Sequence, residues 1–177
     1  DWSSDVCSSV FRILKPLQLD SWLANVWIAI PRILGGTSLC LEFGSPKFGM
    51  PRSTTEEMGL FQVASWFPED VSKFAIPFSL APTFFAWMGA ATEAIEGLLL
   101  ALGLGTRICS VFVAVTMLTA IFMEKWPQAM EYGSSWPLLP AAGFLWIALY
   151  SILTGSGKIG ADYWIAKKFE NATKDSI

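Results

Sequence analysis

The chain has 177 residues, of which 53% are hydrophobic and 15% charged, and it contains nine Trp and 13 Phe. Because soluble domains carry about a quarter charged residues, this composition predicts a small membrane protein with one domain. A net charge of −3 gives no basis for nucleic-acid binding. The absence of His removes the commonest metal ligand and excludes a Ser-His-Asp or Cys-His nucleophile. Cys7, Cys40 and Cys109 show no zinc spacing, so we expect no metal site.

Residues 1–10 differ in character from everything that follows them. They are polar and rich in Ser, and they lack the charged-then-apolar order of a signal peptide. They resemble a translated sequencing-adapter scar, so we treat them as non-native and leave them out of the functional interpretation. We assign residues 11–166 to one membrane domain and residues 167–177 to a polar tail.

Four apolar runs are long enough to cross a bilayer, which takes about 20 helical residues. We predict an all-α fold in which these spans form a polytopic four-helix bundle. Pro31 is expected to kink or split the first span, and Gly103 and Gly105 mark the turn between the second and third. The predicted spans cover residues 22–43, 78–104, 107–123 and 137–153, and a glycine-rich stop follows at 155–157.

The only long connection between spans covers residues 44–77. Its middle looks like a helix start, with two Thr followed by two Glu at 54–57. An apolar bias then runs from residue 58 to residue 67, between Pro51 and Pro68. This segment is too short to cross the membrane. We therefore predict an interfacial helix over residues 55–67, in the first loop.

The distribution of Lys and Arg predicts the orientation in the membrane. In a four-span arrangement, seven of these residues fall on one side and four on the other, where they are mixed with six acids. Because cytoplasmic loops carry the excess of basic residues, we expect both termini to be cytoplasmic. The larger group consists of Arg12, Lys15, Arg107, Lys158, Lys167, Lys168 and Lys174.

Two carboxylates, Glu93 and Glu96, lie inside the second predicted span. Charged groups at this depth cost about 2.5–3.5 kcal/mol each, so they usually face a partner or a cavity. Arg32 is the only basic residue in the interior of a predicted span, because Arg107 caps the start of the third span at the membrane surface. We predict that Arg32 pairs with Glu93; the alternative is that Arg32 snorkels to the surface. At positions i and i+3, both carboxylates would line one interior cavity. The candidate functional residues are Glu93, Glu96, Arg32, Arg107, Glu42 and Lys47.

Three stretches of the chain resemble the DoxX family of small four-helix membrane proteins. The first stretch contains Arg32 and Gly36 and is followed by a Gly–Lys pattern at Gly44 and Lys47. The third stretch is the turn at 155–157 together with Asp162. The second, most specific stretch consists of Glu93, Gly97, Gly103, Leu104, Thr106 and Arg107. The chain departs from the family pattern at Glu42, Glu96 and Ser156.

The resemblance implies a multi-pass protein of the bacterial inner membrane, or of its archaeal equivalent. Some DoxX relatives are subunits of a thiosulfate:quinone oxidoreductase, and others act in thiol and oxidative-stress homeostasis through partner proteins. The family therefore implies the fold more firmly than the function.

Three functions fit these observations, and the sequence leaves all three open. In the first, the protein is a redox accessory subunit in which the buried carboxylates deliver protons to a quinone. It would have no intrinsic cofactor, and a soluble or membrane-bound oxidoreductase partner would supply the electrons. In the second, the acids bind a proton or cation in a small transporter. In the third, the protein is purely structural, as a single chain or as a homo-oligomer, and the acids only hold the helices of the bundle together.

Overall fold

The computed structural model describes residue 17 and residues 19–51 and 58–174. The scar-like segment 1–10 lies outside the described residues, as do positions 55–57 of the predicted loop helix. Within the described ranges the chain is helical, and its only β pairing is an isolated bridge between Phe48 and Val63. The all-α prediction is confirmed.

Within these ranges, four helical stretches are long and apolar enough to cross a membrane, which confirms the four-span prediction. They are Trp22–Gly44, Pro82–Leu102, Thr106–Tyr132 and Trp136–Thr154. The first combines α2 (Trp22–Ser38) with the π-helical η1 (Leu39–Gly44), and the second combines α4 (Pro82–Ala91), the π-helical η3 (Thr92–Glu96) and α5 (Gly97–Leu102). The third combines α6 (Thr106–Ala120), the π-helical η4 (Ile121–Lys125) and α7 (Trp126–Tyr132), and the fourth joins η5 (Trp136–Leu138) to α8 (Leu139–Thr154).

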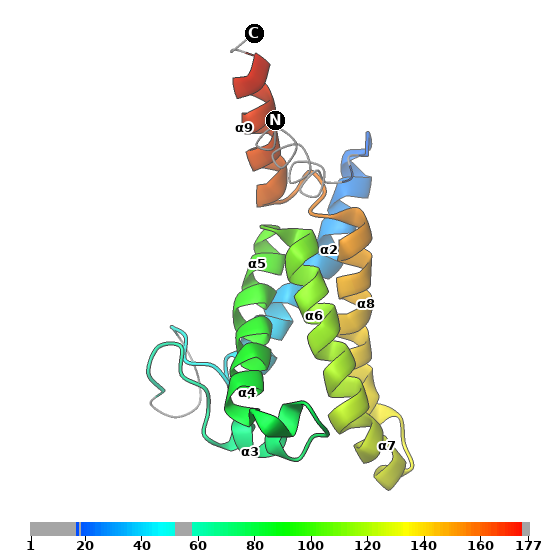
Figure 1. The fold of residues 1–177 in the computed structure, drawn as a ribbon. Helices are drawn as coiled ribbons and strands as arrows, with labels where there is room; N and C mark the ends of the chain where they lie inside the picture. Colours follow the sequence, from blue (N-terminus) through cyan, green and yellow to red (C-terminus); the bar gives the residue numbers. More distant parts are fainter. Residues whose placement is uncertain (1–16, 18, 52–57, 175–177) are drawn as a thin grey trace.

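The remaining described elements lie at the two ends of the bundle. In Figure 1, α3 (Trp66–Ser72) lies at the lower end, below α4 and apart from α7. The short η2 (Phe78–Leu80) leads from α3 into α4. At the upper end, α9 (Ala161–Lys174) projects beyond the spans (Figure 1). The boundary drawn between residues 166 and 167 falls within α9.

Small residues let the first and second spans approach closely. A Cβ atom at Gly36 would lie 2.6 Å from the carbonyl oxygen of Gly97 and 2.7 Å from the amide nitrogen of Ala101. A Cβ atom at Gly97 would in turn lie 3.0 Å from the amide nitrogen of Cys40. Membrane helices pack closely at such small residues, because lipid provides no hydrophobic force between helices. Gly36 and Gly97 therefore fix where α2 crosses α5.

The predicted glycine turns are present. Gly103 and Gly105 have φ angles of 72° and 58°, and Gly155 and Gly157 have φ angles of 66° and 63°. Side chains with a Cβ atom rarely adopt this left-handed region, which is why Gly ends the helices here. The turns bring α5 against α6 and end α8 before α9 begins.

The third span is longer than predicted. We expected residues 124–127 to end it, but the helix continues to Tyr132. Pro127 lies in the first turn of α7, after the π-helical turn η4, where a missing N–H group costs little. Pro31 likewise lies within a continuous α2, so the first span is not split.

The first loop contains a helix, as predicted, but in a different place. The helix is α3 (Trp66–Ser72), whereas residues 58–65 are not helical. Their backbone is bonded to the chain just after the first span: the Gly49 amide donates to Gln62 O (2.7 Å) and the Ala64 amide to Lys47 O (3.0 Å). These long-range backbone bonds replace the local helix that the apolar bias predicted.

Replacing Gly36 with Leu should destabilise the bundle, because the new side chain meets backbone atoms that cannot move aside. Overpacking of this kind costs about 1–3 kcal/mol. Gly143→Leu is the matched control, since a Cβ atom at Gly143 meets nothing within 4 Å. Thermal unfolding of the detergent-purified proteins measures both effects. An unfolding temperature of Gly36→Leu equal to that of the wild type would contradict the close crossing.

Candidate functional site

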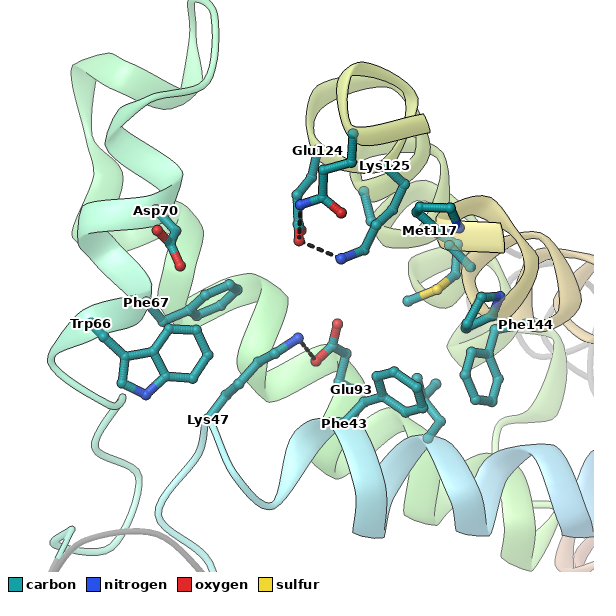
Figure 2. Close-up of a pocket in the computed structure, with 16 residues that line it drawn as sticks. Phe43, Lys47, Trp66, Phe67, Asp70, Glu93, Met117, Glu124, Lys125 and Phe144 are labelled. Carbon is teal, nitrogen blue, oxygen red and sulfur yellow. Dashed lines mark hydrogen bonds and ion pairs between the residues drawn. The ribbon is translucent and has the colours of Figure 1, made fainter. Parts of the chain in front are cut away.

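A partly buried ion pair joins the first loop to the second span. The Lys47 ammonium donates a hydrogen bond to Glu93 Oε2 at 2.6 Å. Glu93 lies on η3, near the middle of its span, and only 6% of its surface is exposed. The Lys47 nitrogen also lies 5.0 Å from the centre of the Phe67 ring of α3, within cation–π range. Figure 2 shows the ammonium between the carboxylate and this ring.

Lys47 reaches Glu93 because two backbones touch. A Cβ atom at Gly44, the last residue of η1, would lie 2.5 Å from Ala94 Cα, so only Gly fits at this crossing. The chain then turns, with the Lys47 amide donating to Gly44 O at 3.0 Å. Both helices are π-helical where they meet, a distortion that is frequent at functional sites. Thus Gly44 and the turn after it determine the partner of Glu93.

The ion pair borders a cavity of about 450 Å³, which we call the end chamber because it lies towards the α3 and α7 end of the bundle. Its walls are largely aromatic and aliphatic, and Figure 2 shows Phe43 and Phe144 on one side and Trp66 and Phe67 on the other. Small-molecule sites in proteins have similar volumes and similarly apolar walls with a few polar groups. The end chamber therefore has the size and lining of a ligand site.

A second ion pair lines the end chamber on η4. Lys125 bonds to Glu124, and Gln128 donates to the same carboxylate at 3.4 Å. Figure 2 shows the Lys125 ammonium projecting towards the space in front of Glu93, with Asp70 of α3 on the facing wall. The chamber thus combines the charges of Lys47, Lys125, Asp70, Glu93 and Glu124 with apolar walls.

The end chamber has a polar outer rim. Asp70, Glu124 and Gln128 also line a recess of about 270 Å³ together with Lys73. Lys73 donates to Asp70 Oδ1 at 2.7 Å, and this hydrogen bond raises the pKa of Lys73 above its ordinary value. Both side chains are exposed, so the pair adds little stability.

Another cavity, of about 270 Å³, lies on the other side of the same ion pair, between α4 and α6. We call it the side chamber. Its wall is mostly apolar and includes Phe74, Phe85 and Met88. The two chambers share Lys47, Phe67, Glu93, Ala120 and Glu124. The Lys47–Glu93 pair therefore stands at their common boundary.

Arg32 does not pair with Glu93, which corrects our prediction. It is buried, and its guanidinium donates to Leu100 O at 2.5 Å, Ala101 O at 2.9 Å and Ile159 O at 2.5 Å. The last carbonyls of a helix have no partner within the helix, and a guanidinium suits them in geometry and charge. The end of α5 lies about 10 Å along the helix from Glu93. Arg32 is therefore used at the turn, away from the chambers.

Asp162 closes the same turn from the other direction. Its carboxylate accepts hydrogen bonds from the amides of Gly105 (2.7 Å) and Thr106 (2.9 Å), the first residues at the start of α6. Its own amide donates to Gly103 O at 2.9 Å. A carboxylate at a helix start satisfies free N–H groups and favours the helix dipole. The family-motif positions Gly103, Thr106 and Asp162 therefore join α9 to the bundle rather than forming a cavity.

The other predicted candidates lie outside both chambers. Glu96 is half-buried and acts electrostatically on the Cys109 thiol of α6, because the wide π-helical turn places it on a different side from Glu93. Glu42 is exposed. Arg107 is half-buried, and its Nε atom has no hydrogen-bond partner among the described residues. Glu93 and Glu96 therefore do not share either of the two chambers.

Sequence reasoning missed several residues of the site. We treated Glu124 and Lys125 as the end of a span, and we gave Asp70 and Phe67 no role. The third helix continues beyond residue 123, and this places Glu124 and Lys125 on the same helix as the apolar wall residue Met117. A longer third span was the signal that would have assigned these two residues to the site.

Comparison with known proteins supports the family resemblance. The sequence model of the DoxX family matches residues 56–126. This segment of the chain is similar to the DoxX family, as the sequence resemblance predicted. The matched DoxX segment includes Glu93, Gly97, Gly103 and Thr106, and it contains α3 and the whole second span. Searches of the curated proteins and of the solved structures gave no match.

A double-mutant cycle distinguishes the two possible partners of Glu93. Glu93→Gln and Lys47→Gln should each lower stability, and the double variant should lose less than the sum, with a coupling of about 1–3 kcal/mol. Glu93→Gln and Arg32→Gln should add, because Arg32 is bonded to backbone carbonyls instead. Unfolding in detergent supplies the values. Coupling to Arg32 with none to Lys47 would refute the ion pair.

Proposed function

We propose that this DoxX-like protein is an accessory subunit of a membrane redox system and that it binds a quinone ring in the end chamber. One observation carries the proposal: a buried carboxylate, Glu93, is paired with the half-buried Lys47 beside an open, aromatic-walled cavity within the membrane-spanning bundle. Charged groups inside a membrane are costly and usually mark a functional site. The cell membrane location, with both termini cytoplasmic, is part of the same proposal.

The residues of the end chamber suit a quinone. Its aromatic side chains offer faces for a flat ring, and the ammonium groups of Lys47 and Lys125 are donors suited to carbonyl oxygens. A bound quinone would supply the redox chemistry, because it takes up electrons and protons together.

The ionisable residues form a route for protons from the rim to the ring. Glu93 can hold a proton at its carboxylate and pass it to a ligand oxygen, with Lys47 fixing the carboxylate in place. Glu124 and Lys125 lie between the outer recess and Glu93 and can relay protons inward, and Gln128 holds Glu124 by a hydrogen bond. The electrons are assigned to a soluble or membrane-bound oxidoreductase partner, because the sequence lacks His and any cofactor-binding motif.

A purely structural role explains one polar cluster of the bundle but not the other. Arg32 and Asp162 are bonded to backbone groups at the turn and have the surroundings of structural residues. Glu93 instead borders two cavities. A carboxylate that only locks helices together needs no open space beside it, so the cavities favour the ligand-binding role.

Purified wild-type protein should bind a water-soluble benzoquinone, and Glu93→Gln should weaken the affinity about tenfold, the effect of losing about 1.4 kcal/mol. Glu42→Gln is the matched control, because Glu42 is an exposed carboxylate outside the chambers. Quenching of Trp fluorescence measures binding, since Trp66 lines the chamber.

Two outcomes would contradict the proposal. One is a wild-type protein that binds no quinone, and the other is an equal affinity in the Glu93→Gln and Glu42→Gln variants. A flux driven by a pH gradient in vesicles, without quinone binding, would favour the transporter instead.

A further inference from the structure

The two chambers open in different directions: the side chamber opens between α4 and α6, and the end chamber opens at the end of the bundle. Met88 of α4 and Val115 of α6 both line it, and 38% and 58% of their surfaces are exposed. Both residues belong to candidate membrane spans, so this opening faces lipid. The end chamber, in contrast, has the polar rim of Asp70, Glu124 and Gln128 at the end of the bundle.

The two chambers also differ in polarity once their shared residues are set aside. The end chamber adds Asp70, Lys125 and Gln128, which bear charges or an amide. The only polar side chains that the side chamber adds are those of Thr116 and Thr119, and the Thr119 hydroxyl already donates to Val115 O at 3.0 Å. The rest of its wall is formed by Val71, Phe74, Phe78, Phe85, Met88 and Val115 together with Gly89.

We propose that the ligand is a single-tailed amphiphile held across both chambers, with its polar ring in the end chamber and its hydrocarbon tail in the side chamber. This inference rests on the proposed function and names the ligand more closely, as a quinone with an apolar side chain. The Lys47–Glu93 pair at the common boundary would mark the junction of ring and tail.

The opening between α4 and α6 gives such a ligand a path from the bilayer. A tail that leaves lipid for the side chamber gains little hydrophobic free energy, since both surroundings are apolar. The chamber instead allows the tail to remain in apolar surroundings while the ring reaches the charged groups. A closed wall at this place would force the tail past Lys125 and Glu124.

Gly89→Leu tests the tail position, because Gly89 lines only the side chamber. A Cβ atom at Gly89 meets only the Phe67 ring, at 3.8 Å, so a larger side chain can extend into the space. Gly143→Leu is the matched control on a face where a Cβ atom meets nothing within 4 Å. Thr119→Phe fills the same chamber from α6 if Gly89→Leu does not fold.

The probes are a benzoquinone without a side chain and the same ring carrying a decyl chain, both titrated against the purified protein in detergent. We expect Gly89→Leu to weaken binding of the decyl compound about tenfold and to leave binding of the bare ring unchanged. Gly143→Leu should change neither affinity.

The outcomes separate this inference from the proposed function. If both chamber-filling variants bind the decyl compound as tightly as the wild type, the tail does not occupy the side chamber, while binding of the bare ring would still support the proposed function. If Gly89→Leu weakens both probes equally, the chamber does not distinguish ring from tail and the inference is overturned. If the wild type binds neither probe, both proposals fail.

Discussion

The cost of a carboxylate inside the membrane determines much of this structure. Glu93 lies near the middle of the span Pro82–Leu102, where an unpaired charge is unfavourable by several kcal/mol. Its partner, Lys47, comes from the first loop and not from a neighbouring span. The loop must therefore fold back into the bundle, and backbone bonds from Gly49 and Ala64 together with the Phe67 ring hold it there. The same folding leaves the end chamber open in front of the pair (Figure 2).

Two polar clusters of the bundle have different surroundings. At the upper turn, Arg32 and Asp162 bond to backbone groups at the end of α5 and the start of α6, and they tie α9 to the spans. At the other end, Lys47 and Glu93 bond to each other beside open space. A buried pair of this kind contributes little net stability, because desolvation offsets the attraction. Its position next to a cavity is the observation on which the proposed ligand site rests.

The parts of the fold that follow from apolar length and from glycine were predictable from the sequence. The four spans and the turns at Gly103 and Gly155 needed only composition, and the burial of Glu93 followed from its depth in a span. The partner of Glu93 was not predictable, because π-helical turns and the close approach at Gly44 change the direction of side chains without a periodic sequence signal. The loop helix was misplaced for a related reason: tertiary backbone bonds fix residues 58–65, and local propensity does not reveal them.

The contact between Lys47 and Glu93 is the central claim, and solid-state NMR in lipid bilayers tests it directly. The measurement is the dephasing of Glu carboxyl carbons by Lys ammonium nitrogens in selectively labelled protein. The account predicts that Glu93→Gln and Lys47→Met remove the same short-range component, which corresponds to the 2.6 Å hydrogen bond, and leave the separate Lys125–Glu124 component in place. Loss of an Arg guanidinium–carboxyl contact in Glu93→Gln, with the Lys signal unchanged, would contradict the account.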